Sequence, residues 1–139
     1  MAEKDSTGEI RRECEARYCE PRHEPIEAGR VRDFLLAMNE PDARQQDEPV
    51  PVLFLLTLGR TRRPQPARGS AVNAGDEYEF FHPVFVNDTI TVSRRVLAVE
   101  EKQGKSGLMY LTRAEISYCN QHGMLVATAH SSVMRWGAR

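Results

Sequence analysis

The feature that most constrains the fold is a strict alternation of side chains between residues 108 and 118. Apolar or small side chains occupy every second position there: Leu108, Tyr110, Thr112, Ala114, Ile116 and Tyr118. Because successive side chains of a strand point to opposite faces, this period of two predicts a β-strand with one buried face. A strand of this length exceeds the usual five or six residues, so the sheet that contains it must curve strongly.

Three further segments have the composition of strands. They are marked by Tyr78, Phe80 and Phe81, by Ile90, Val92, Val96 and Val99, and by Leu125, Ala127, Ala129 and Val133. The breaks between these segments fall at Asn87-Asp88, at residues 103–107 and at residues 120–123, which are rich in residue types that tolerate positive φ. We therefore expect antiparallel strands in a meander.

A helix is predicted upstream of these strands. Val31, Phe34, Leu35 and Met38 recur at i, i+3, i+4 and i+7, which places one apolar stripe on a helix over about residues 28–39. Pro41 cannot continue such a helix. Since this is the strongly amphipathic helix available to cover the sheet, the predicted fold class is α+β, with a long curved antiparallel sheet wrapped around a central helix.

The remaining segments set the domain organisation. Residues 1–16 are dominated by charged side chains and are expected to form a flexible or short helical arm, followed by a single domain over residues 17–139. Residues 50–58 are almost continuously apolar and are expected to be buried. Residues 59–70 combine prolines and glycines with four arginines, which predicts an exposed basic loop.

Charge and hydropathy exclude several classes of function. A formal net charge of -1 gives no global attraction to nucleic acid. No apolar run approaches the roughly 20 residues of a membrane span, and the first residues lack the apolar core of a signal peptide, so we expect a cytoplasmic protein with no membrane partner.

Cysteine and histidine spacing indicates neither a disulfide framework nor a metal site. The cysteines are Cys14, Cys19 and Cys119, and the histidines are His23, His82, His122 and His130. Neither set has the paired spacing of zinc ligands. We expect three reduced thiols, no bound metal, and structural or surface roles for the histidines.

Two segments carry a family resemblance. Residues 76–136, with the aromatic strand, the Asn87-Asp88-Thr89 turn and three long strands in order, look like the N-terminal-type domain of MaoC-like dehydratases. Residues 27–42 resemble that domain's first helix and its exit, and the two segments together cover more than half the chain. The resemblance implies a single hot-dog domain. It also implies a lyase of lipid metabolism, the (R)-specific enoyl-CoA hydratase or dehydratase, which acts on acyl thioesters.

The hydratase motif of that family is degenerate in this chain. The family's motif is Asp-x-Asn-Pro-x-His, in which the carboxylate and imidazole converge on one water to move its protons. The corresponding positions hold Glu40 at the Asp place and Gln45 at the His place. Glutamine has no group that titrates near neutral pH, so we expect no complete catalytic pair in this chain.

The resemblance therefore implies a non-catalytic or tunnel-shaping subunit. A second hot-dog subunit with an intact motif would supply the Asp/His pair, in a heterodimer or heterotetramer. Pairing of edge strands into one continuous sheet is a common way for two such domains to associate. Coenzyme A would be present only as part of the acyl-CoA substrate, with no other cofactor.

Substrate-binding candidates come from two segments. Arg60, Arg62, Arg63 and Arg68 could hold the phosphates of coenzyme A, or could be a solvated surface loop. Relatives often carry Gly-Gly or His-Gly before the aromatic strand. This chain has Asn73-Ala74-Gly75, so Asn73 and Gly75 are candidate ligand contacts in that loop. The apolar run at residues 50–58 could line an acyl channel or simply pack in the core.

Two other functions remain open on the sequence alone. A hot-dog acyl-CoA thioesterase could use Glu40 or Asp42 to activate water. A non-enzymatic acyl-CoA-binding or scaffold module would need neither residue.

Overall fold

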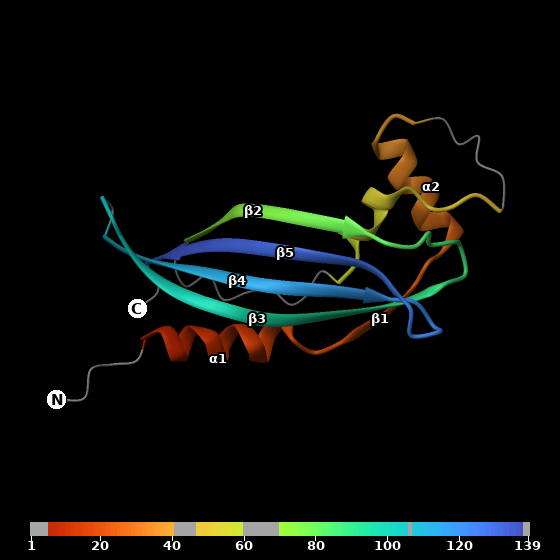
Figure 1. Cartoon of the computed structure of the whole chain (residues 1–139). Helices are drawn as coiled ribbons and strands as arrows, with labels where there is room; N and C mark the ends of the chain where they lie inside the picture. The colour runs from red at the N-terminus through yellow and green to blue at the C-terminus, as the bar shows by residue number, and fades with distance from the viewer. Residues whose placement is uncertain (1–5, 41–46, 60–69, 106, 138–139) are drawn as a thin grey trace.

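The computed structural model describes residues 6–40, 47–59, 70–105 and 107–137, and contains five strands and three helical segments (Figure 1). In chain order the elements are α1 (Ser6–Tyr18), β1 (Arg22–Pro25), α2 (Ala28–Ala37), the 3-10 helix η1 (Val52–Thr57), β2 (Ser70–Phe80), β3 (Thr89–Gly104), β4 (Gly107–Cys119) and β5 (Leu125–Trp136). Within these ranges, every helix is too short or too polar to cross a membrane.

The strands form one antiparallel sheet in the order β1-β3-β4-β5-β2. The alternating residues of β4 lie where the period of two predicts them, but the expected meander holds only for β3, β4 and β5. β2 pairs with β5 instead of β3, because β1 and β4 already occupy the two sides of β3. The sequence does not predict strand β1, since its four residues, Arg-His-Glu-Pro, show no apolar alternation.

Two helices share the covered face of the sheet, and neither spans it. β3 has 16 residues, or about 53 Å, whereas the ten residues of α2 extend about 15 Å. α2 accordingly lies at one end of the sheet, and α1 lies along β3 (Figure 1). In α1, Cys14 is buried and lies near Thr112, whose side chain is on the same face as that of buried Ile116. Arg11 also donates a hydrogen bond of 3.0 Å to the carbonyl oxygen of Val96.

The charged segment at the N-terminus is thus a packed helix from Ser6 onward. It ends at Tyr18, two residues beyond the boundary expected at residue 16.

The main core lies where α2 and η1 meet the sheet. Its buried residues are Ile26, Val31, Leu35, Val50, Phe54, Leu55, Leu58, Val84, Ile90, Val92, Ile116, Tyr118, Val126, Ala127 and Ala129. Phe54 packs edge-on against Phe34 of α2, with ring centroids 5.7 Å apart. The expectation that residues 50–58 are buried throughout was wrong for Val52 and Leu53, which are 50% and 48% exposed, because a helical turn at the surface directs some side chains outward.

A backbone capping motif ends α2 and fixes the position of Glu40. Asn39 has a φ of 57°, its N–H donates to the carbonyl of Leu36, and the N–H of Glu40 donates to the carbonyl of Leu35. This pattern is a Schellman motif, which ends a helix by one residue in the left-handed conformation. The helix therefore stops ahead of Pro41, two residues earlier than the sequence pattern suggested.

The predicted turn at Asn87-Asp88 also has a clear structural basis. Asn87 adopts the expected positive φ, at 77°. The Asp88 carboxylate accepts a hydrogen bond of 2.9 Å from the Phe85 N–H and another of 2.9 Å from the Gln121 side-chain amide. Asp88 thus ties the entry to β3 to the turn between β4 and β5.

The main core also holds a buried polar group on the covered face of the sheet. Tyr118 is 2% exposed and hydrogen-bonds to Tyr78, with Arg94 and Asp76 nearby. Burial raises the pKa of Tyr118 far above its ordinary value, Tyr78 adds to the rise, and Arg94 opposes it. The Tyr118 hydroxyl therefore remains protonated, and it is a fixed hydrogen-bond partner close to the edge strand β2.

The core packing predicts different costs for two adjacent residues of η1. Phe54→Ala should lower the free energy of unfolding by about 3–5 kcal/mol, because it leaves a cavity against Phe34 and the sheet. Leu53→Ala, which truncates a half-exposed side chain, should cost about 1 kcal/mol or less. Urea denaturation followed by circular dichroism measures both, and equal losses would contradict the assignment of Phe54 to the core.

The environment of Tyr118 predicts a dependence of stability on alkaline pH. Below the ordinary tyrosine pKa of about 10, Tyr118 is protonated in both the folded and the unfolded chain, so its contribution is complete. Above that pH the unfolded chain loses the proton first, and stability falls as pH rises. Tyr118→Phe should lose about 1 kcal/mol at pH 7 but decline less steeply than the native protein above pH 10. Identical slopes in urea denaturation at pH 9 to 11 would contradict this.

Candidate functional site

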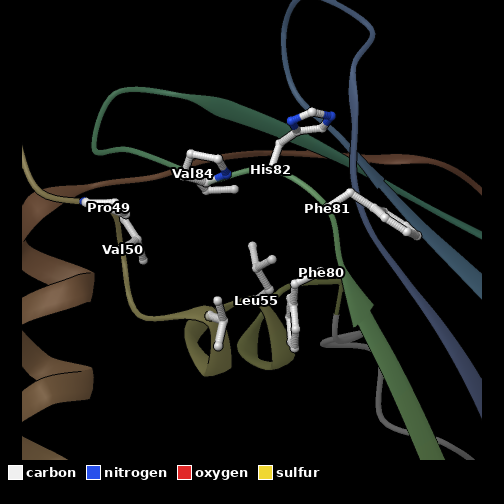
Figure 2. Close-up of a pocket in the computed structure, with 9 residues that line it drawn as sticks. Pro49, Val50, Leu55, Phe80, Phe81, His82 and Val84 are labelled. Atoms are coloured by element: carbon white, nitrogen blue, oxygen red, sulfur yellow. The ribbon is translucent and has the colours of Figure 1, made fainter.

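An apolar pocket lies between η1 and the end of β2. Its volume is about 270 Å³, and it is lined by Pro49, Val50, Val52, Leu55, Phe80, Phe81, His82, Pro83 and Val84. In Figure 2, Phe80 lies on one side of the pocket and Val50 on the other, with Leu55 of η1 between them. The pocket is therefore built from two segments that are about 30 residues apart in the sequence.

Backbone hydrogen bonds hold these two segments together. The N–H of Val50 donates to the carbonyl of Val84 over 2.7 Å, which joins the chain before η1 to the chain after β2. The N–H of Phe81 donates to the carbonyl of Val126 over 2.8 Å and so extends the contact with β5 beyond the end of β2. Phe80, 38% exposed, stacks on Tyr78 with ring centroids 6.1 Å apart. The aromatic wall of the pocket is thus part of the edge strand.

The lining of the pocket is almost entirely apolar, so it suits an apolar ligand chain. His82 is its single titratable side chain, and the lining contains no carboxylate. An imidazole without a partnered carboxylate does not form the acid/base pair that hydration requires. Across the described residues, moreover, no group of three His, Cys, Asp or Glu side chains could hold a metal ion.

The predicted motif positions are not part of this pocket. Glu40 is exposed at the end of α2 and is not among the residues that line the cavity. Gln45 lies outside the described residues, as do Asp42 and the arginines of the basic loop, Arg60, Arg62, Arg63 and Arg68. A role for these arginines in binding substrate therefore stays a prediction.

Asn73 and Gly75 lie within β2, so the expectation that they form a loop before the strand was wrong. They flank a β-bulge at Ala74, where the pairing with β5 shifts by one residue. Gly75 has a φ of 145°, and its N–H donates to the Asn73 side-chain oxygen over 2.8 Å, while the Asn73 amide donates to the Asp76 carboxylate. Asn73 and Gly75 thus stabilise the bulge. Their contact with a ligand stays a prediction.

Several pocket residues were not identified from the sequence. Nothing in the sequence sets Phe80, Pro83 and Val84 apart as the lining of a pocket, although the apolar run at residues 50–58 is a possible channel wall. Val50, Val52 and Leu55 of that run line the pocket, and Val50 and Leu55 are also buried, so one segment serves both the core and the cavity. The N–H of His82 donates to the carbonyl of Val126 over 3.3 Å, just beyond the end of β2.

Comparison with solved structures identifies the fold. The chain is similar to a chain of the ChsH1-ChsH2 complex from Mycobacterium tuberculosis, with a TM-score of 0.72 and 12% identity over 95% of this chain and 92% of the other. It is similar to a chain of the HadBC (3R-hydroxyacyl-ACP dehydratase) complex of the same organism, with a TM-score of 0.64 and 16% identity over 84% and 93% of the two chains. A MaoC-like dehydratase from Rhodospirillum rubrum gives a TM-score of 0.63 and 17% identity over 85% and 91%.

The sequence comparison is consistent with these structures. None of the curated protein sequences matches the chain. The family model described as "FAS1-like, dehydratase domain region" matches residues 16–129, which is most of the chain. The predicted α+β hot-dog fold is confirmed, and the chain belongs to the family described as the FAS1-like dehydratase domain region.

Proposed function

We propose that this chain is the non-catalytic, tunnel-shaping subunit of a heteromeric MaoC-like enoyl-CoA hydratase or dehydratase. In this proposal a partner hot-dog subunit supplies the Asp/His pair that adds water to a 2-enoyl-CoA. This chain contributes a wall for the acyl group.

The observation that carries the proposal is the apolar pocket without an acid/base pair. Its volume of about 270 Å³ is slightly below the roughly 300–1,000 Å³ of cavities that hold a whole small ligand. It ends at Phe80, the last residue of the edge strand, where a second subunit would complete its wall. A cavity of this kind can hold the tail of an acyl thioester while the reacting carbons lie elsewhere.

The degenerate hydratase motif supports assigning the proton transfers to the partner subunit. Hydration needs one group to take a proton from water and a group to give one to the α-carbon. Gln45 cannot do either at neutral pH, and Glu40 is an exposed residue that lies outside the pocket lining. The proton transfers would therefore take place on the partner's side chains.

The comparisons support a heteromeric arrangement. Both Mycobacterium tuberculosis relatives are complexes whose names give two components, ChsH1-ChsH2 and HadBC. The second is a 3R-hydroxyacyl-ACP dehydratase, which is chemistry on an acyl thioester. By analogy, this hot-dog domain would function with a second hot-dog chain, as a heterodimer or heterotetramer.

The substrate would be an acyl-CoA, and the reaction would need no cofactor beyond the coenzyme A that the substrate carries. The phosphates of coenzyme A would be held by the arginines of residues 60–68, since guanidinium groups bind phosphate oxygens in a bidentate manner. The thioesterase alternative lacks comparable support in the described residues, because the exposed Glu40 does not face the pocket.

Reconstitution with a catalytic subunit tests the proposal. The chain is co-expressed with a hot-dog subunit that carries an intact Asp-x-Asn-Pro-x-His motif, and hydration is followed by the loss of the ultraviolet absorbance of the enoyl thioester. We expect no turnover from this chain alone and turnover from the complex. Replacing the partner's motif histidine should abolish the activity, whereas Glu40→Gln and Gln45→Ala in this chain should change kcat less than about threefold.

The same assay can contradict the proposal. Full turnover by the purified chain alone, lost on Glu40→Gln, would show that this subunit has its own catalytic machinery. Release of free thiol from acyl-CoA, lost on the same substitution, would favour the thioesterase.

The pocket predicts a change in acyl-chain preference on substitution of Val52. Val52→Trp should fill the cavity from its half-exposed side without disturbing the buried core. If the indole displaces two methylene groups of the acyl tail, about 1.6 kcal/mol of burial is lost, or about 15-fold in kcat/KM for long-chain substrates. Turnover of a four-carbon enoyl-CoA should be unaffected.

Leu53→Trp is the matched control, because Leu53 is equally exposed on the same helix but does not line the pocket. Kinetics of the reconstituted complex with short and long substrates check both variants. Equal effects of the two substitutions, or equal effects on short and long substrates, would remove the pocket from the acyl site.

A further inference from the structure

The edge strand β2 has one unpaired side. It pairs with β5 along its length, and every residue from Ser70 to Phe80 except Tyr78 is exposed. An exposed strand edge presents free N–H and C=O groups and is a template for a further strand. The side chains of β2 therefore determine which strand can be added.

A ladder of charged side chains crosses the sheet and ends at this edge. Arg95, Glu115, His130 and Glu77 are directly opposite one another on β3, β4, β5 and β2. Glu115 accepts a hydrogen bond of 3.0 Å from Arg95 and lies 3.3 Å from the His130 imidazole. The side chains thus alternate between basic and acidic types from β3 to β2.

Glu77 is the last residue of this ladder, because no described strand lies on the other side of β2. Among the described residues, its carboxylate makes no ion pair, and neither does that of Glu79 on the same face of β2. Opposite charges on directly paired residues stabilise a sheet, and like charges destabilise it. The pattern across the four strands is therefore continued by a cation on the next strand.

The same carboxylates oppose pairing of β2 with a second copy of itself. In an antiparallel pair of identical strands, a two-fold axis at Glu77 or Glu79 places that carboxylate opposite its own copy. An axis at Asp76 does the same, and an axis at Tyr78 places Glu77 opposite Glu79 in both halves of the pair. Each of these registers sets like charges directly opposite one another.

The β-bulge at Ala74 opposes the remaining register in which two copies of β2 could overlap over a long stretch. An axis at Gly75 would avoid direct opposition of acids, but the extra residue Ala74 changes the phase of the strand. Glu77 on the outer face would then lie opposite Asn73, whose side chain is on the covered face. An axis before the bulge would pair only the neutral residues 70–73, which is too short an overlap to join two sheets.

We infer that β2 pairs with the edge strand of a different hot-dog chain, one that carries lysine or arginine opposite Glu77 and Glu79, and that these acids disfavour self-pairing. The inference rests on the proposed function for the existence of a separate hot-dog partner. The bias against self-pairing follows from β2 alone.

The experiment uses the full chain as its own probe. The native chain, the variant Glu77→Lys/Glu79→Lys and their equimolar mixture are compared by analytical ultracentrifugation at low ionic strength. Native chain and variant should each remain monomeric, since each has like charges at these positions. The mixture should form a 1:1 dimer, with a dissociation constant at least about tenfold below that of either self-association. Added salt should weaken it.

Glu20→Lys/Glu101→Lys is the matched control, with the same change in net charge at two exposed residues outside β2. Its mixture with the native chain should stay monomeric. Hydrogen exchange should show amide protection in residues 75–80 of the charge-swapped dimer, and Glu77→Gln/Glu79→Gln should self-associate more tightly than the native chain.

A native chain that dimerises through β2 would overturn the inference, as would a charge-swapped mixture that remains monomeric. These outcomes are independent of the hydratase assay. Loss of hydratase activity in every reconstituted complex, with the charge-swapped dimer intact, would refute the proposed function and leave the edge assignment standing.

Discussion

The mismatch in length between the strands and α2 governs the rest of this structure. A helix of ten residues cannot cover strands of 11 to 16 residues, so the covered face is divided between α2 with η1 at one end and α1 along β3. Apolar packing is concentrated where α2 and η1 lie. That part of the sheet also carries the hydrogen-bonded Tyr118 and Tyr78, and the apolar pocket opens where η1 meets the end of β2.

The pocket and the edge strand belong to one surface. Phe80 is both the last residue of β2 and a wall of the cavity, so any strand added to β2 would approach the mouth of the pocket. Burial of an acyl tail and recognition of a partner would then depend on adjacent residues of the same element. This arrangement fits a subunit that shapes a binding cavity while another subunit carries out the chemistry.

Much of the fold could be predicted from local patterns, and most of the site could not. The period of two in β4 and the apolar stripe of α2 each depend on residues within one element, which is why both were identified. β1 has no apolar alternation, and its existence depends on pairing with residues 89–92 of β3. The pocket depends on the hydrogen bond between Val50 and Val84, a tertiary contact that no local pattern reveals. The bulge at Ala74 likewise exists only in relation to β5.

The strand order has a consequence for the synthesis of the chain. β2 is made early, but its partner in the sheet is β5, the last strand, and contacts between such distant segments close late in folding. As the chain leaves the ribosome, β3 and β4 can pair before residues 125–136, the partner of β2, have been synthesised. The aromatic wall at Phe80 can therefore take its place only after residues 125–136 have emerged, so the pocket and the free edge of β2 form together and later than the pairing of β3 with β4.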